Sequence, residues 1–225
     1  MLKCTFLGNC GLLLETESDA VLVDCPNGIH RAYDRLSEDE FARMRSGFSP
    51  YDKLKGLLFT HLHDDHYDKL RVVELVEQDD SLLLFAPDEA TPNSGVLRVG
   101  GFLVRYFKVF HSGENLRDVP HWVLVVEADG KRVFITGDSE WTEQILTDLA
   151  ITFHPDCGIF NPNFVSHDEG RRLMALIPKN YIYHYPVNRE DLYGIARKCR
   201  SRFIKHAEEL RNVTLVDWLP FTAEI

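Results

Sequence analysis

The chain has 225 residues, of which 44% are hydrophobic, which is enough to bury a sizeable core in a globular protein. Its formal net charge of −10 argues against a nucleic-acid partner held by bulk electrostatics. No apolar run approaches the roughly 18 residues of a membrane span, and the N-terminus lacks the pattern of a secretory signal. A cytoplasmic protein without membrane contact is therefore expected.

The first third of the chain is expected to form antiparallel strands followed by a helix. Residues 20–24 are the second arm of a hairpin that ends on Asp24, ahead of the turn Cys-Pro-Asn-Gly. Ser37 precedes a run of acidic residues in the manner of a capping box, which predicts a helix to about Arg45. The elements predicted here are strands over residues 2–7, 11–15 and 20–24, a helix over 37–45, a strand over 56–59 and a helix over 69–77.

The rest of the chain begins with more strands and then alternates strands with helices. One antiparallel pair flanks Gly100 and Gly101, and another turns at Asp129 and Gly130. The predicted elements are strands over residues 82–86, 96–99, 102–110, 122–127 and 132–136, a helix over 140–149, a strand over 157–160, a helix over 168–176, a strand over 181–183, the longest helix over 190–211 and a last strand over 213–218.

Two hairpins resemble each other across the chain. Residues 11–24 and 122–138 each form an apolar hairpin whose second arm ends on an aspartate, Asp24 in the first and Asp138 in the second. No low-complexity segment or flexible linker separates them. The pattern favours a single domain over residues 1–225, built from two similar halves.

The cysteines do not form a recognisable framework. They are odd in number, scattered and never spaced as Cys-x-x-Cys, which favours reduced thiols in a cytosolic protein. Burial as small apolar side chains is the expected role, and metal ligation by one of them is the alternative. The five residues are Cys4, Cys10, Cys25, Cys157 and Cys199.

The most informative stretch is Thr-His-Leu-His-Asp-Asp-His over residues 60–66, directly after the apolar strand at 56–59. In an extended segment residues i and i+2 point the same way, so His61 and His63 can hold one ion together. Asp65 and His66 follow where the chain turns, and they would face a second position. Neutral imidazole and carboxylate are preferred ligands of zinc and similar divalent ions. The alternative is a polar loop that is rich in histidine by chance. This spacing of three histidines and an aspartate is rarely expected by chance.

This motif resembles the signature of the metallo-β-lactamase fold superfamily. The resemblance implies an α/β fold, a four-layer αββα sandwich with helices on both outer faces and the metal site along one edge. It also implies three further ligands at the ends of later strands. The sequence supplies them in order as His111, Asp138 and His184, the last preceded by Pro178.

By the same resemblance, one ion would be held by His61, His63 and His111. The second would be held by Asp65, His66 and His184, with Asp138 bridging the two. Other roles are open for the later residues. His111 could be a capping or surface histidine, Asp138 a turn residue after Gly137, and His184 a packed core histidine.

Several polar residues near these positions have weaker assignments. Asp24 is expected to orient a ligand imidazole, with a turn role as the alternative. Asp64 and Asp68 are expected at a helix start. His167 is the candidate for substrate contact or proton donation, against the alternative of a solvated loop histidine. The histidines without a spacing argument are His30, His121, His154 and His206.

The ligand set predicts a metal-dependent hydrolase with two divalent ions, zinc by default and manganese or iron as alternatives. Water bridging two cations becomes a hydroxide nucleophile near neutral pH, and Asp65 would align it as a catalytic residue. The expected substrate is a small ester-type molecule, which is a phosphodiester, a phosphorylated sugar or a lactone. The chain resembles small cytosolic hydrolases of the superfamily similar to ascorbate-phosphate lactonases. It departs from true β-lactamases, which have cysteine where Asp138 stands.

Two other function classes share this scaffold. One is a mononuclear iron oxidoreductase of the persulfide dioxygenase type, and the other is a metal-binding protein without turnover. A full set of ligands argues against the second. The only partner expected is a small-molecule substrate, with no nucleic acid and no membrane, and homo-oligomerisation is left open.

Overall fold

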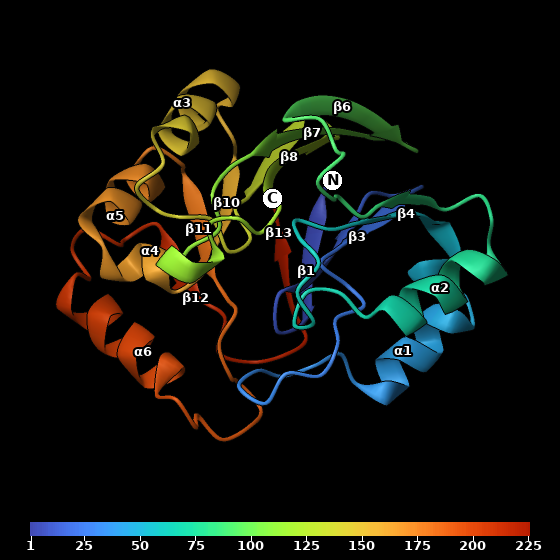
Figure 1. The fold of residues 1–225 in the computed structure, drawn as a ribbon, viewed down its shortest axis with the longest axis horizontal. Coiled ribbons are helices and arrows are strands. Elements are labelled where there is room, and N and C mark those ends of the chain that lie inside the picture. Colours follow the sequence, from blue (N-terminus) through green and yellow to red (C-terminus); the bar gives the residue numbers. More distant parts are fainter.

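Two β-sheets lie face to face, and helices cover the outer surface of each (Figure 1). The structure is a computed structural model that describes residues 1–225. In Figure 1, α1 and α2 lie on one side of the paired sheets, and the helices from α3 onward lie on the other. This arrangement is the expected four-layer sandwich.

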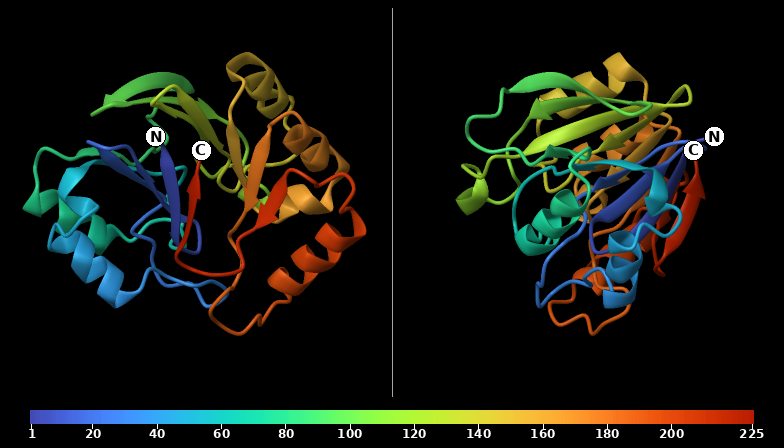
Figure 2. Two further views of the ribbon diagram at one scale, coloured as in Figure 1. Left: turned by 180° about the vertical axis from the view of Figure 1, so that it is seen from behind. Right: turned by 90° about the vertical axis from the view of Figure 1, so that its right-hand side faces the viewer.

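The first sheet has six strands in the order β13-β1-β2-β3-β4-β5. Neighbours are antiparallel from β13 to β3, and then β3, β4 and β5 run parallel. The strands are β1 (Lys3–Gly8), β2 (Gly11–Glu15), β3 (Ala20–Val23), β4 (Leu54–Leu58), β5 (Leu83–Phe85) and β13 (Phe221–Glu224). The last strand of the chain therefore returns to the first sheet and pairs with β1, so that the two termini lie close together (Figure 2).

The second sheet has seven strands in the order β12-β11-β10-β9-β8-β7-β6. It is antiparallel from β6 to β9 and parallel from β9 to β12. The strands are β6 (Ser94–Val99), β7 (Phe102–Lys108), β8 (Trp122–Ala128), β9 (Lys131–Ile135), β10 (Cys157–Phe160), β11 (Lys179–Ile182) and β12 (Val213–Leu215).

The helices are short and lie between or after the parallel strands. They are α1 (Glu38–Arg45), α2 (Lys69–Gln78), α3 (Gln144–Phe153), α4 (Asn163–Ser166), α5 (Asp168–Ala175) and α6 (Ile195–Lys205), with single 3₁₀ turns at Tyr51–Lys53 and Glu114–Leu116. None of them combines the length and apolar character of a membrane-spanning segment.

Strands buried on both faces explain the continuous apolar runs of the sequence. Successive side chains of a strand point to opposite faces of its sheet. Leu12 and Leu14 of β2 therefore pack in the core between the sheets, whereas Leu13 packs under α1 and α2 with Phe41 and Val72. A third core lies between the second sheet and its helices.

The sequence predictions fail mainly at element ends. The longest helix, expected over residues 190–211, is only Ile195–Lys205, because Gly194 takes a left-handed φ of +67° immediately before it. The helix expected over residues 140–149 starts later, at Gln144. The last predicted strand ends at Leu215 instead of residue 218, and the helix α4 and the strand β13 were not predicted.

Candidate metal centre

The predicted ligands lie just beyond the ends of strands that run in the same direction. His61 follows β4 in the first sheet, and Asp138 and His184 follow β9 and β11 in the second. The segments after β7 and β9 are joined by an isolated bridge between His111 and Ser139, and the Ser112 N–H donates to the Asp138 carbonyl at 2.7 Å. Strand direction therefore gathers residues from distant parts of the chain at one edge of the sandwich.

All seven predicted ligands gather at this edge in two groups. Within each group the potential ligand atoms lie within 4.8 Å of one another. The first group is His61, His63 and His111, and the second is Asp65, His66, Asp138 and His184. The resemblance implied the same sets, except that it placed Asp138 as a bridge between them.

Asp138 lies between the two groups. Its Oδ2 is 3.6 Å from His66 Nε2, 3.8 Å from His111 Nε2 and 3.9 Å from His184 Nε2. His184 Nε2 is also 3.6 Å from Asp65 Oδ2. These separations exceed hydrogen-bond length, but they suit atoms that share a cation at about 2.0–2.2 Å each.

Unpartnered nitrogen atoms show that the residues fit divalent cations. The Nε2 atoms of His61, His66 and His111 are buried and have no hydrogen-bond partner within the protein. Buried polar atoms are normally paired, because an unsatisfied one costs about 1–3 kcal/mol. Three such atoms directed into one cluster of imidazoles and carboxylates are explained by ions that they would coordinate.

Hydrogen bonds on the far side of three rings fix their orientation. His66 Nδ1 lies 3.0 Å from Asp24 Oδ2, and His111 Nδ1 lies 2.7 Å from the Ser112 carbonyl. His61 Nδ1 lies 3.1 Å from Thr60 Oγ1. Partners of this kind set the tautomer and leave Nε2 free for a metal ion. Asp24 therefore contacts one of the predicted ligand imidazoles, as its predicted role requires.

The buried environment sets the charge of the ligands. Burial lowers the pKa of His61 well below its ordinary value, so this imidazole is neutral and able to coordinate. Burial alone would raise the pKa of Asp138, but the His184 and His66 imidazoles hold that pKa well below its usual range. His61 therefore offers a neutral nitrogen atom and Asp138 an ionised carboxylate, which are donors that zinc prefers.

Two of the site residues have strained backbones. Asp24 has a φ of +50° and His184 a φ of +70°, both in the left-handed region that residues other than glycine rarely adopt. Each residue closely follows a strand, β3 or β11. Such strain, of order 1–3 kcal/mol for each residue, persists where the surrounding structure enforces it, and functional sites are enriched in it.

Sequence reasoning missed three residues that support the cluster. His121 is fully buried, and its Nε2 accepts a hydrogen bond of 3.0 Å from the Asp138 N–H. The Asn9 amide and the Cys10 thiol both donate to the Asp65 carbonyl, at 2.8 and 3.0 Å. In the sequence, only the position of His121 could have indicated its role. It directly precedes β8, which is the neighbour of β9, the strand that Asp138 follows.

All five cysteines are buried and free, as predicted. Burial raises the pKa of the Cys10 thiol to about 12, so this side chain is a neutral thiol. Its Sγ also lies within 4.8 Å of ligand atoms of His66 and His184. Cys10 thus belongs both to the core between the sheets and to the wall of the site, whereas the other four cysteines lie in the cores alone.

None of the remaining candidates belongs to either group. The His167 ring stacks on the Trp141 ring at a centroid distance of 3.9 Å, immediately before α5. Asp68 caps α2 by accepting from the N–H groups of Leu70 and Arg71, as predicted. The helix-start prediction for Asp64 is wrong, because this residue lies in a turn ahead of α2.

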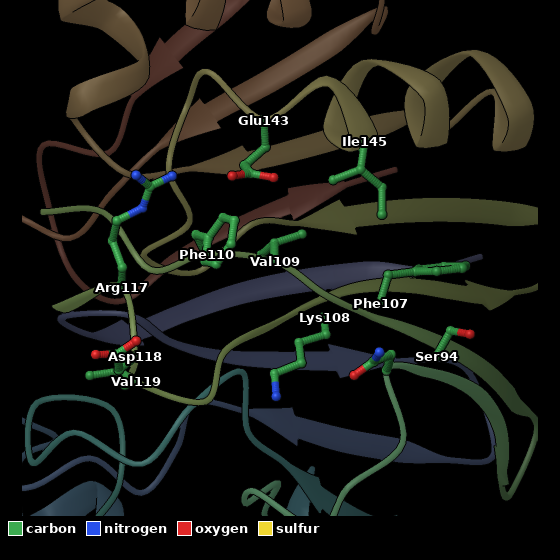
Figure 3. A pocket seen from close by; sticks show the side chains of 11 residues that line it. Ser94, Phe107, Lys108, Val109, Phe110, Arg117, Asp118, Val119, Glu143 and Ile145 are labelled. Carbon is green, nitrogen blue, oxygen red and sulfur yellow. The ribbon is translucent and has the colours of Figure 1, made fainter. Parts of the chain in front are cut away.

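A separate cavity of about 620 Å³ lies beside the β7 strand (Figure 3). Its wall includes Val109 and Phe110, directly before His111, and the Arg117 guanidinium lies 4.7 Å from the centroid of the Phe110 ring. None of the seven clustered residues lines it. The cavity is therefore next to the cluster along the chain and distinct from it.

No family model matches the sequence, and no curated protein matches it. Solved structures match along the whole chain. The metallo-β-lactamase fold protein YhfI from Bacillus subtilis is 15% identical, with 100% of this chain and 99% of that chain covered and a TM-score of 0.66. Igni18, a metallo hydrolase from Ignicoccus hospitalis, is 13% identical, with 100% and 99% covered and a TM-score of 0.64.

A third structure, CmlA from Streptomyces venezuelae, is a diiron β-hydroxylase. It is 13% identical, with 100% of this chain and 54% of that chain covered and a TM-score of 0.70. Each of these three similarities covers the full length of the present chain. The chain has the metallo-β-lactamase fold.

Proposed function

We propose that this protein is a metal-dependent hydrolase with two divalent ions at the edge of the sandwich. The observation that carries the proposal is the meeting of seven histidine and aspartate side chains in two groups, with three buried Nε2 atoms unpartnered. YhfI and Igni18, which share the fold, are described as a metallo-β-lactamase fold protein and a metallo hydrolase. The fold alone does not fix an activity, so the site supplies the argument.

The proposed division of ligands follows the two groups. His61, His63 and His111 would hold one ion, Asp65, His66 and His184 the other, and Asp138 would bridge them, in keeping with its distances to both groups. Bound divalent cations, zinc in the first instance, supply Lewis acidity that activates water and polarises a substrate oxygen. Among the protein's own groups, Asp65 is proposed to orient the attacking water.

The proposed substrate is a small ester-type molecule, namely a phosphodiester, a phosphorylated sugar or a lactone. Ions within a largely buried cluster provide strong local positive charge, which suits an anionic or polarised oxygen. The acidic protein surface, with a formal net charge of −10, disfavours a large polyanion. A small phosphorylated molecule satisfies both conditions.

His167 is proposed as the donor of a proton to the leaving group. It stacks on Trp141, three residues beyond Asp138, which keeps the imidazole beside the segment that carries the bridging carboxylate. The variant His167→Phe retains a ring for stacking and removes the proton. We expect it to lower kcat about 100-fold with an unchanged metal content. An unchanged kcat would contradict this role.

The first experiment is to measure metal content by elemental mass spectrometry on protein purified without added metal. Two zinc or manganese ions per chain, together with turnover of a phosphodiester or lactone, are the expected result. The variant His61→Ala should lose one ion, and His154→Asn, an exposed histidine away from the site, should lose none. A single iron without hydrolysis would favour the oxidoreductase alternative. Absence of any bound or acquired metal would overturn the proposal.

A further inference from the structure

Two loops from opposite halves of the chain are clasped together beside the second group. The Asp34 carboxylate accepts hydrogen bonds from the N–H groups of Val187 at 2.6 Å and Asn188 at 3.2 Å. In return, the Arg189 guanidinium donates to the carbonyls of His30 at 3.1 Å and Tyr33 at 2.6 Å. The clasp therefore holds the chain both at Tyr33, through its carbonyl, and at the next residue, Asp34, through its carboxylate.

The Tyr33 side chain lies against a predicted ligand. Its ring centroid is 4.3 Å from that of His184, at an interplanar angle of 56°. On its other side the ring stacks on His30 at 5.0 Å. The clasp and the two ring contacts together hold the phenol in one orientation, which limits the rotamer freedom that a bound ligand would otherwise have to remove.

The Tyr33 side chain that carries the hydroxyl lies against the second group. Its ring contacts His184, whose Nε2 is 3.6 Å from Asp65 Oδ2. No hydrogen bond within the chain uses this hydroxyl, although the side chain is partly buried. A fixed donor without a protein partner, on a side chain that contacts His184 of the second group, is available to a ligand bound there.

We propose that Tyr33 is a substrate-contacting residue, whose hydroxyl donates a hydrogen bond to a phosphoryl oxygen bound beside Asp65 and His184. This assignment rests on the proposed function, because it requires ions in the cluster to attract the anion. It favours the phosphorylated substrates within the proposed class. In this assignment the ions would supply the positive charge, and the Tyr33 hydroxyl would orient the bound phosphoryl oxygen.

The test compares the binding of inorganic phosphate by calorimetry to the metal-loaded wild type and to Tyr33→Phe. This substitution removes the hydroxyl and keeps the ring against His184. We expect phosphate affinity to fall at least about tenfold, as for a hydrogen bond to a charged group, with metal content unchanged. The matched control is Tyr193→Phe, an exposed tyrosine whose ring lies under Arg31, which should bind phosphate as the wild type does.

Three results would overturn the assignment of Tyr33. They are equal phosphate affinity in Tyr33→Phe and wild type, no phosphate binding by the metal-loaded wild type, and loss of metal in the variant, which would indicate a purely structural role. Phosphate binding does not require turnover. Failure of the proposed hydrolase function, seen as metal-loaded wild type without activity on any ester, is therefore distinguishable from failure of this assignment.

Discussion

Asp24 Oδ2 lies 3.0 Å from His66 Nδ1, and both side chains are completely inaccessible to solvent. Asp24 directly follows β3, and His66 lies in the turn ahead of α2. The same carboxylate also accepts from the Thr60 N–H at 2.7 Å. One buried anion thus fixes both ends of the motif that carries four of the predicted ligands.

The variant Asp24→Asn tests this relationship. The Thr60 hydroxyl also donates to Asp24, at 2.8 Å. An amide can still accept a hydrogen bond, but it carries no charge and cannot bind the His66 Nδ1–H together with the Thr60 N–H and hydroxyl equally well. We expect affinity for the second ion to fall about 10–100-fold, as is typical when the partner of a ligand imidazole is lost. Metal titration followed by elemental analysis measures this. Asp129→Asn, in the exposed β8–β9 turn, is the control, and equal affinity in Asp24→Asn and wild type would refute the role.

His121 supports Asp138 through the backbone. The variant His121→Ala leaves the Asp138 N–H without its acceptor, and this group lies next to the cluster. We expect a loss of about 1–3 kcal/mol in the free energy of unfolding of the metal-free protein, measured in urea. His154→Asn provides an exposed comparison at a position with left-handed backbone, which asparagine tolerates. A variant as stable as the wild type would show that water or another group satisfies this N–H.

Much of this centre was predictable from sequence because its ligands are defined by local spacing and strand ends. His61, His63, Asp65 and His66 lie within one short segment, and His111, Asp138 and His184 each follow a strand that the apolar pattern reveals. His121, Asn9 and Cys10 were not predictable, because their roles depend on partners distant in sequence, such as Asp138 and Asp65. Tyr33 escaped notice for the same reason, since only the clasp with Arg189 places it against His184.

The ends of helices were harder to predict than the site. The segment over residues 190–194 has a polar composition that suits a helix, yet Gly194 takes a left-handed conformation and the helix starts only at Ile195. The strand β13 is short and its pairing partner, β1, lies at the opposite end of the chain. Pairing over such a separation leaves no local signal in the sequence.

The metal-free protein should lose stability as the pH falls. Burial lowers the pKa of His61 and of His121 well below the ordinary 6.5, so below about pH 6.5 the unfolded chain binds protons that the folded protein does not. Each of these two groups contributes up to about 1.4 kcal/mol per pH unit to the loss.

His66 acts in the opposite direction on this pH dependence. Burial disfavours its charged form, but its neighbours, among them the Asp24 and Asp138 carboxylates, outweigh burial and raise its pKa. Its contribution to stability is complete below pH 6.5 and is lost as the pH rises through that raised pKa. Urea unfolding between pH 7.5 and 5.5 should therefore show a net loss toward acid. The loss should be smaller in His121→Gln, and stability that is constant or rises toward acid would contradict the prediction.

Binding of metal should stabilise the folded protein, because the cluster of ligands exists only there. Ions at 100 times their dissociation constant stabilise by about 2.7 kcal/mol for one site. For a chain of this length that corresponds to a rise in Tm of about 5–10 °C, which thermal unfolding with added zinc or manganese, compared with chelator, would measure. The double variant His61→Ala/His111→Ala lacks two of the three first-group ligands, so it should retain only the shift due to the second group. Equal Tm values with zinc and with chelator would show that the buried Nε2 atoms of His61, His66 and His111 serve another purpose.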